Sequence, residues 1–255
     1  MKANGNYFMV IETSDYLHRL EANQFNLFTQ KLHNGISKVL KSFKAKIVLH
    51  NDNTYHVVFN SVSNCVFCAL KIQSKFKYIT PIFDSSIRQL KISITNRSKG
   101  KKSKILAIRM CEIVKDQIVI TNEVKHDYEL ENKNIIISKD RVKTLSTSNQ
   151  QFLTNLMDYV EQIWNDCEFN ISDLSKPLKY SKSQVYRKLK SLTGKSPSTF
   201  IRDYRLKKAM ELMRNKTHYI SDIAKQTGFK SSTYFSKCFK DRFEILPSKY
   251  LQQHT

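Results

Sequence analysis

The amino-acid sequence predicts an α+β protein in two parts. Residues 1–147 should form an α+β domain, and residues 148–255 an all-α domain in which two copies of one helical unit are joined by a long helix. Three observations predict this fold class. Strand-like and helix-like segments alternate over the first 95 residues. The segment after residue 171 occurs twice, at a spacing of 49 to 50 residues, and apolar residues recur at helical intervals between the two copies.

Apolar periodicity defines the elements of the first part. Residues 7–12 form a short, β-prone run, and residues 15–43 carry apolar side chains at intervals of three and four, which predicts a long helix. Two strand-like runs around Asn51-Asp52-Asn53 predict a hairpin. The strands of this hairpin are residues 46–49 and 54–59, and a helix at 61–76 and a strand at 90–95 follow them. This β-α-β-β-α-β order is that of the ferredoxin-like split unit.

The second half of the first part is more polar. Residues 97–104 form a basic segment, for which a solvated loop is the first interpretation and an auxiliary phosphate contact the second. We expect a helix at 105–113, edge strands at 117–121 and 134–138, and a helical segment at 124–130 between them. The polar, Ser- and Thr-rich residues 141–151 mark the domain boundary, and an amphipathic helix at 151–166 opens the second part.

The repeated unit of the second part is a short helix, a tight turn and a second helix. Ile171-Ser172-Asp173-Leu174 aligns with Ile220-Ser221-Asp222-Ile223, and we expect the serine of each copy to cap the short helix. After a one-residue insertion, Ser196-Pro197-Ser198 aligns with Leu246-Pro247-Ser248. This pattern, used twice, predicts two helix-turn-helix units.

The second helix of each unit, the candidate recognition helix, has one apolar and one polar face. Val185, Leu189 and Leu192 recur at i, i+4 and i+7, so this stripe should pack inward. Phe235 and Phe239 take the same stripe in the second copy. The opposite faces carry Ser183, Tyr186, Arg187 and Lys190 in the first copy, and Ser232, Thr233, Ser236, Lys237 and Lys240 in the second. A major groove accepts such a face, whereas the plain alternative is a solvated helix surface.

Residues 197–215 connect the two units. Their apolar stripe consists of Phe200, Ile201, Tyr204, Ala209, Met210 and Met213. About 18 residues that rise about 1.5 Å each give a rod of roughly 27 Å. Such a rod could hold two recognition helices about one DNA turn apart, roughly 34 Å, so that one protomer reads two successive segments of the major groove.

The charge distribution agrees with a polyanionic partner. The chain has a formal net charge of +21, and residues 171–255 contain 19 Lys and Arg against 6 Asp and Glu, which is +13. The excess is therefore densest over the repeat. A membrane surface is the rival polyanion. However, we find no run of about 18 apolar residues and no signal-type stretch at the N-terminus, so we expect a cytoplasmic protein without a membrane partner.

Four motifs in the repeat resemble the DNA-binding domain of AraC/XylS-type transcription regulators. They are the segments 180–197 and 223–240, Tyr204-Arg-Leu-Lys-Lys-Ala209 and Leu246-Pro-Ser-Lys-Tyr250, and the resemblance covers about 100 of the 255 residues. It implies a sequence-specific transcription regulator that binds double-stranded DNA and contacts RNA polymerase. A small-molecule effector and a homodimer are further partners that it implies, and it leaves the choice between activator and repressor open.

The resemblance also assigns roles to individual positions. Those that match the family's base-reading residues are Ser183, Tyr186 and Arg187 in the first unit, and Ser232, Thr233, Ser236 and Lys237 in the second. We expect Lys182, Lys190, Lys230 and Lys240 to contact phosphates and set the register.

Three positions depart from the family's pattern. Lys179 replaces the usual turn glycine, which the second copy keeps as Gly228. Glu244 stands where glycine is common. Pro177 should kink or shorten the first helix of the first unit.

The first part resembles the catalytic domain of class III nucleotide cyclases in the segments 9–16, 52–59, 68–73 and 90–94. In that family two aspartates hold the metals. The first falls on Glu12 here, and the second falls on Asn53, with Asp52 beside it. Two-metal chemistry needs carboxylates that carry charge to both ions. We therefore expect a non-catalytic domain, without metal or cofactor, that senses a ligand, dimerises or does both.

Two other functional hypotheses stay open. The alternative from the enzyme class is an active nucleotide cyclase fused to a DNA-binding domain. A third hypothesis is a sensor that binds a small molecule in its N-terminal part without chemistry. Cys65 and Cys68 have C-x-x-C spacing, but they lie in an apolar helical run without a second pair, so we expect neither a metal nor a redox site. We interpret all five cysteines as reduced thiols.

Overall fold

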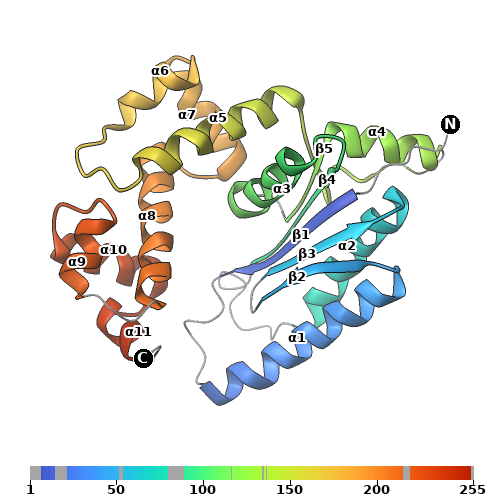
Figure 1. The fold of residues 1–255 in the computed structure, drawn as a ribbon, viewed down its shortest axis with the longest axis horizontal. Coiled ribbons are helices and arrows are strands. Elements are labelled where there is room, and N and C mark those ends of the chain that lie inside the picture. Colours follow the sequence, from blue (N-terminus) through green and yellow to red (C-terminus); the bar gives the residue numbers. More distant parts are fainter. Residues whose placement is uncertain are drawn as a thin grey trace. The chain divides into compact units, whose positions relative to one another are not determined.

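The computed structural model describes residues 7–14, 22–51, 54–79, 89–115, 117–133, 135, 137–214 and 219–253. The start of the helix predicted at 15–43, and Asp52 and Asn53, lie outside the described residues. The chain divides into two compact units, residues 1–153 (unit 1) and 154–255 (unit 2). Helix α5 (Thr147–Ile163) runs across this division, and the boundary proposed at 147–148 falls at its start (Figure 1).

Unit 1 is built on one six-stranded sheet in the order β2-β3-β1-β4-β5-β6. Its first elements are β1 (Tyr7–Ser14), α1 (Ala22–Ser42), β2 (Lys46–His50), β3 (Thr54–Phe59), α2 (Val62–Ile79) and β4 (Gln89–Asn96). Met9 of β1 pairs with Val57 of β3 on one side and with Ile94 of β4 on the other, and both pairings are antiparallel. β2 continues the antiparallel sheet beyond β3. The predicted ferredoxin-like order of strands and helices is thus confirmed.

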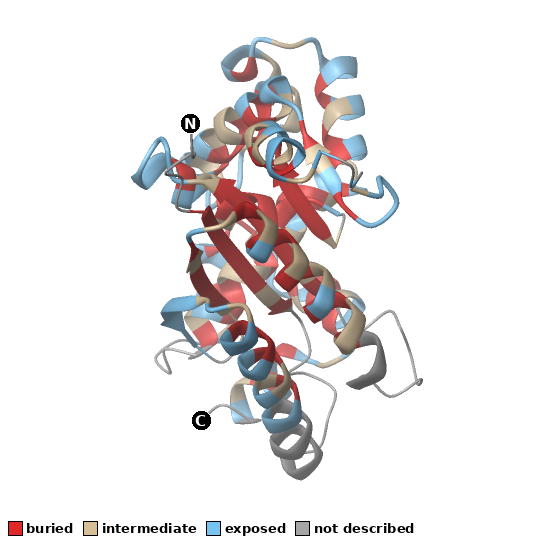
Figure 2. Cartoon of the chain, turned by 90° about the vertical axis from the view of Figure 1, so that its right-hand side faces the viewer, coloured by how far each residue is buried: buried red, intermediate tan, exposed pale blue. Residues whose placement is uncertain are grey.

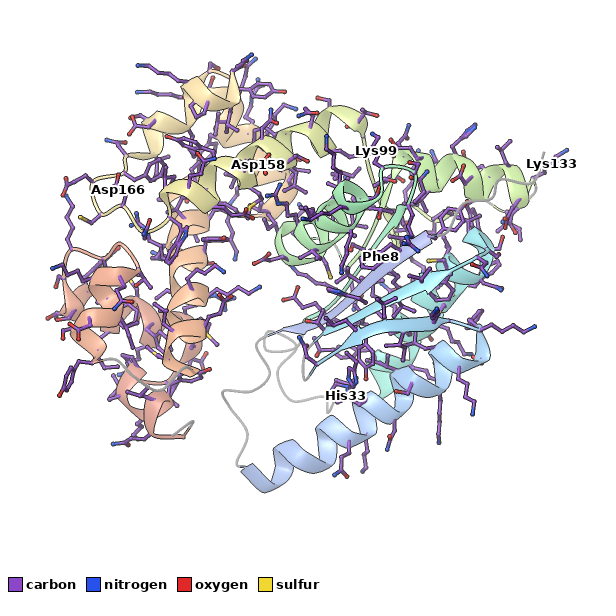
Figure 3. All side chains as sticks on the ribbon, viewed as in Figure 1. Phe8, His33, Lys99, Lys133, Asp158 and Asp166 are labelled. Carbon is purple, nitrogen blue, oxygen red and sulfur yellow. The ribbon has the colours of Figure 1, made fainter. Side chains whose placement is uncertain are left out.

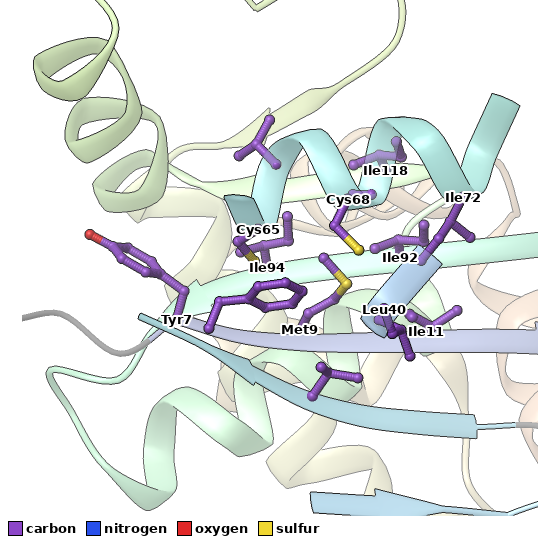
Figure 4. Close-up of a cluster of buried hydrophobic side chains, with 14 of the residues drawn as sticks. Tyr7, Met9, Ile11, Leu40, Cys65, Cys68, Ile72, Ile92, Ile94 and Ile118 are labelled. Atoms are coloured by element: carbon purple, nitrogen blue, oxygen red, sulfur yellow. The ribbon is translucent and has the colours of Figure 1, made fainter. Parts of the chain in front are cut away.

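Alternate residues of β1 enter two cores, one on each face of the sheet. Met9 and Ile11 belong to the larger core, which includes side chains of α1, α2 and α4 (Asn122–Glu131). Figure 4 shows them beside Cys68 of α2. Phe8 packs on the other face, against Ala107 of α3 (Lys101–Ile113). Because both faces are covered, β1 is apolar from Tyr7 to Ile11, and the central strands are buried (Figure 2).

Two strand predictions in unit 1 are wrong. The expected edge strand at 117–121 is β5 (Ile118–Thr121), which lies inside the sheet, parallel to β4 and to β6 (Lys143–Leu145). All four of its residues are buried, as is typical of an interior parallel strand. The expected strand at 134–138 is not seen, since the described residues 135, 137 and 138 are not in a strand. The outer strand β6 comes instead from the polar stretch 141–151.

Helices α3 and α5 begin four residues earlier than predicted, at Lys101 and Thr147. Part of the basic segment 97–104 is therefore helical, not loop. The hydroxyl of Ser146 accepts a hydrogen bond from the backbone N–H of Asn149 (3.4 Å). The Ser- and Thr-rich stretch 141–151, which we expected to mark the domain boundary, thus contains β6 and the capped start of α5. The helix predicted at 124–130 is confirmed as α4.

We expect His56 to make unit 1 sensitive to acid. Its side chain is buried on β3 with its ring edge-on to Phe8 of β1 (Figure 3 labels Phe8), and its Nδ1 atom has no hydrogen-bond partner among the residues that the structure describes. Burial, and then the charge of Lys104, lower the pKa of His56 below its usual value. The folded state therefore holds His56 neutral, while the unfolded chain takes up a proton near pH 6.5.

We expect the free energy of unfolding of unit 1 to be constant with respect to this group above about pH 6.5, and to fall as the pH drops from there towards the folded pKa. Hydrogen exchange of the β1 and β3 amides at pH 7.5 and 5.5, corrected for intrinsic exchange rates, measures the loss. His56→Gln should reduce the pH dependence, whereas replacement of the exposed His126 by glutamine should leave it as in the wild type. An unchanged pH dependence in His56→Gln would show that other groups cause it.

Unit 2 is all-helical. Its elements after α5 are a 3-10 helix (Ile171–Leu174), α6 (Ser175–Leu178), α7 (Lys182–Thr193), α8 (Pro197–Arg214), α9 (Ile220–Gln226), α10 (Ser232–Phe243) and α11 (Pro247–Gln253). The predicted pair of helix-turn-helix units joined by a long helix is confirmed, with α8 as the connection (Figure 1). Helix α7 packs against α8, and so do α9 and α10.

The caps predicted for the first helix of each unit are wrong. The side chain of Asn170 caps the 3-10 helix by accepting from the N–H of Ser172 (3.0 Å), so Ser172 lies inside the helix. Tyr219 precedes α9 and makes no side-chain cap, so Ser221 is not a cap either. The predicted effect of Pro177 is confirmed, because the first helix of the first unit is split into the 3-10 turn and the four-residue α6.

Candidate nucleic-acid interface

The two candidate recognition helices, α7 and α10, begin in the same way. The hydroxyl of Ser181 accepts from the N–H of Gln184 (3.3 Å), and the side chain of Gln184 accepts from the N–H of Ser181 (2.9 Å), which completes a capping box. The hydroxyl of Ser231 accepts from the N–H of Tyr234 (3.3 Å) at the start of α10. Each cap lies four residues before the first buried side chain of its helix. The one-residue insertion therefore lies in the preceding turn.

The apolar stripes fix the rotation of both helices. Val185, Leu189 and Leu192 of α7 are buried, as predicted. Phe235 and Phe239 of α10 are fully buried among other aromatic rings. The ring centroid of Phe239 lies 4.7 Å from that of Phe243 and 5.7 Å from that of Tyr250. A stripe held in this way leaves the opposite face of each helix for solvent or a ligand.

The residues predicted to contact DNA lie on the solvent side of these helices. Lys182, Ser183, Tyr186, Arg187 and Lys190 are exposed on α7. Lys230, Ser232, Thr233, Lys237 and Lys240 are exposed on α10 or just before it, and Ser236 is half-buried. The structure thus brings together one set on each helix, and both helices pack against α8. Their contact with DNA stays a prediction.

Sequence reasoning missed one aromatic residue on this surface. Tyr234 is 54% exposed in the first turn of α10, comparable with Tyr186 at 49% on α7. Its ring lies 6.2 Å from that of Phe229. The signal was an aromatic residue beside small polar ones, Ser231-Ser232-Thr233. It was missed because the side on which Tyr234 emerges depends on where α10 begins.

Lys230, a predicted phosphate contact, is held by an ion pair. Its Nζ lies 2.9 Å from a carboxylate oxygen of Glu168, and both side chains are largely exposed. The hydrogen bond, and then the attraction between the charges, raise the pKa of Lys230 and lower that of Glu168. The carboxylate takes one of the hydrogen bonds that the Lys230 ammonium can donate. A backbone phosphate and Glu168 would therefore compete for the same ammonium group.

A second contact connects the end of α5 to helix α8 and to the turn between α9 and α10. Arg205 of α8 donates from Nε to the backbone oxygen of Trp164 (2.7 Å) and from Nη2 to that of Asp166 (2.7 Å). Asp166 lies in the segment that follows α5 (Figure 3). A methyl group on Gly228 would lie 2.9 Å from the Trp164 oxygen and 3.0 Å from the Arg205 guanidinium. The turn between α9 and α10 therefore packs directly against Trp164 and Arg205.

Three turn residues of unit 2 share a left-handed backbone conformation. Gly228 has a φ of 75°, Lys179 at the matching turn of the first unit has 58°, and Glu244 after α10 has 59°. Both departures from the family's glycine therefore keep the backbone that glycine would favour. An L-residue in this conformation costs about 1–2 kcal/mol.

Glu244→Gly should stabilise unit 2 by about 0.5–1 kcal/mol. Glycine removes the strain of the left-handed conformation, but it also raises the conformational entropy of the unfolded chain, which offsets part of the gain. The N–H of residue 244 still reaches the carbonyl of Lys240, at 2.7 Å in this structure. Urea unfolding followed by the fluorescence of Trp164, the single tryptophan of the chain, measures the change. Glu244→Ala keeps the left-handed strain and removes the charge, so an equal gain in that variant would contradict the conformational explanation.

The candidate sites of unit 1 are weaker. Burial raises the pKa of the Cys65 thiol well above its usual value and that of Cys68 to about 12, so both are neutral thiols in the core. Glu12 is half-buried on β1, while the other positions that match the cyclase metal site lie outside the described residues. Within the described ranges, no group of three or more His, Cys, Asp or Glu side chains could hold a metal ion. In the same ranges no helix is both long and apolar enough to cross a membrane.

Comparison with known proteins finds similarity over the repeat. Residues 174–253 match the family model described as a helix-turn-helix domain. The HTH-type transcriptional activator RhaR of Pectobacterium carotovorum is 40% identical over 74 residues, 29% of this chain and 26% of that protein. Histidine kinase P4 of Formosa agariphila is 32% identical over 143 residues, 51% of this chain and 10% of that protein. The chain thus spans about a quarter or less of the length of these two curated relatives.

A third relative matches over most of both chains. The TCP pilus virulence regulatory protein of Vibrio cholerae is 25% identical over 252 residues, which are 92% of this chain and 89% of that protein. The similarity therefore extends beyond the repeat into unit 1.

Proposed function

Because residues 174–253 form an AraC-type helix-turn-helix domain, we propose that the whole protein is a sequence-specific DNA-binding transcription regulator with a non-catalytic N-terminal regulatory unit. One observation supports this most strongly. Two equivalent helices bury their apolar stripes and expose matching polar and basic faces, and both pack against one connecting helix. A protein that only needed a stable helical core would not need both faces to match.

The proposed roles divide between bases and phosphates. Arg187 on α7 and Lys237 on α10 carry cationic groups at positions from which they can reach base edges. Ser183, Tyr186, Ser232, Thr233 and Ser236 contribute smaller polar or apolar base contacts. Lys182, Lys190, Lys230 and Lys240 contact phosphates, which sets the register without reading sequence.

The roles of unit 1 are part of the same proposal. It binds a small-molecule effector, forms a homodimer or does both, and the DNA-bound protein contacts RNA polymerase in the cytoplasm. Glu12 and Asn53 supply too little negative charge for two metal ions. Incubation of the purified full chain with ATP or GTP and Mn²⁺ should therefore yield no cyclic nucleotide. Turnover that Glu12→Ala abolishes would instead support the cyclase alternative.

The dependence of binding on salt tests the proposed function. Full-length protein is titrated with a duplex that it has selected from a random pool, by fluorescence anisotropy at several salt concentrations. If four lysines contact phosphates, each Lys→Ala change should reduce the slope of log K against log salt by about 0.9 and weaken binding to all sequences alike. Failure to select any duplex above a random background would refute the proposal.

Glu168→Gln should tighten DNA binding about two- to five-fold at moderate salt, because it removes the carboxylate that competes for Lys230 and repels the phosphate. The same anisotropy titration measures it. Glu161→Gln is the control, since it removes an equal charge from an exposed position on α5. Equal effects of the two variants would mean that only net charge had changed.

A further inference from the structure

Asp203 of α8 forms ion pairs with both helix-turn-helix units. Its Oδ2 atom lies 2.7 Å from Nζ of Lys195, in the turn that joins α7 to α8. The same oxygen lies 3.7 Å from Nε of Arg242, near the end of α10. One carboxylate on the connecting helix therefore meets a cation from the first unit and a cation from the second.

The environment of Asp203 makes these contacts stronger than ordinary surface ion pairs. Its side chain is only 13% exposed, while those of Lys195 and Arg242 are 38% and 36% exposed. A carboxylate with so little access to water is screened less by solvent and salt than an exposed one. Arg242 also lies 5.5 Å from the ring of Phe243, which restricts where its guanidinium can go. The burial of Asp203 and the ring of Phe243 beside Arg242 thus both restrict the geometry of the ion pair.

We propose that Asp203 is a positioning residue that fixes the placement of α10 relative to α7, and so sets the spacing between the two DNA segments that the protein accepts. The inference rests on the proposed function, since it assumes that both helices bind one duplex. Apolar packing in a shared buried core holds α8 and α10 together, and the ion pair adds a charged contact between one turn of α8 and the end of α10. The Asp203–Arg242 contact joins the far end of α10 to the same turn of α8 that holds the first unit.

The expected consequence follows from bivalent binding. Two weak sites that are held rigidly at the matched spacing bind with a high effective concentration, and the advantage disappears when the spacing is wrong. A looser connection lowers affinity at the matched spacing and broadens the range of spacings that bind. Asp203→Asn should therefore change spacing tolerance, whereas loss of a simple stability contact would weaken all spacings in proportion.

The test uses the full-length protein and a duplex selected by the wild type from a random pool. Derivatives carry two or five extra base pairs between the two preferred segments, or one scrambled segment. We expect wild-type affinity to fall about 30-fold or more on the two-base-pair insertion, and that of Asp203→Asn to fall less than about five-fold from its own, lower starting value. Affinity for the duplex with one intact segment should be the same in both proteins.

Three controls keep the outcome specific. Asp203→Glu should restore the discrimination against the inserted base pairs. Asp241→Asn removes an equal charge from an exposed position beside Arg242 and should behave as the wild type. Arg242→Met, which breaks the same contact from α10, should reproduce the broad tolerance even if Asp203→Asn fails to fold.

A spacing profile of Asp203→Asn or Arg242→Met that parallels the wild type would overturn the inference and leave the proposed function standing. If the wild type selects a single segment, the inference fails because the two helices do not bind one duplex together. If it selects no DNA, the proposed function itself fails, so the two failures are distinguishable.

Discussion

Gly228→Ala should destabilise unit 2 by about 2–4 kcal/mol, the sum of the left-handed conformation for an L-residue and a forced repacking against neighbouring atoms. The added methyl group would approach the backbone oxygen of Trp164 to 2.9 Å, and the side chain of Arg205 lies equally close, so neither side offers space. Because Arg205 is held by two backbone oxygens, it cannot move away without losing those hydrogen bonds. Urea unfolding of the full chain, monitored through Trp164 at this contact, measures the loss.

Lys179→Ala is the matched control for Gly228→Ala. Lys179 occupies the same turn of the first unit with a φ of 58° and already carries a side chain. Since its strain is unchanged by the substitution and its side chain is exposed, we expect a change below about 0.5 kcal/mol. If both variants lose the same stability, the close approach at Gly228 is not what matters.

Arg187→Ala should weaken binding to the selected duplex by about 1–3 kcal/mol and relax the base preference at one position. Arg187 is exposed on α7, two residues after the buried Val185, so its guanidinium is on the side that would enter the groove. A guanidinium can make two hydrogen bonds to one base edge, which neither alanine nor lysine reproduces. Competition binding against single-base variants of the duplex measures both affinity and preference.

The companion variants separate base reading from charge. Arg187→Lys keeps the charge and should still lose preference at that base. Lys190→Ala should weaken every sequence about equally and leave the base preferences intact. If Arg187→Ala weakens binding but leaves the base preference unchanged at every position, Arg187 contacts a phosphate and not a base.

Residue patterns predicted unit 2 well where local periodicity decides the structure. The stripes of Val185, Leu189, Phe235 and Phe239 are buried as expected, because only one rotation of such a helix about its axis buries its apolar face. The order of the first four strands was also predicted, since hairpins and crossovers of these lengths permit few arrangements.

Patterns failed where a short segment depends on its neighbours. β6 has only three residues, and pairing with β5, not its own composition, makes it a strand. The four apolar or small residues of β5 are compatible with an edge or an interior position until its partners are known. Asn170, not Ser172, caps the 3-10 helix because the helix begins at Ile171. Residue preferences do not locate the first residue of a helix this closely.

The contacts that position the two helix-turn-helix units could not be predicted from the sequence alone. Asp203, Lys195 and Arg242 are separated along the chain, and nothing in their spacing brings them together. The contact of Gly228 with Trp164 and Arg205 likewise joins three segments that meet only in the folded unit. Such contacts carry no periodic signal, so side-chain type alone could not assign them.

Selection of bound duplexes from a random pool by the full-length protein, at one stated salt concentration, tests the central claim most directly. Two helices presented by one unit predict two preferred segments whose centres lie about 10 base pairs apart, one turn of the duplex. Enriched sequences that share a single preferred segment, or show no preference beyond the random pool, would contradict it.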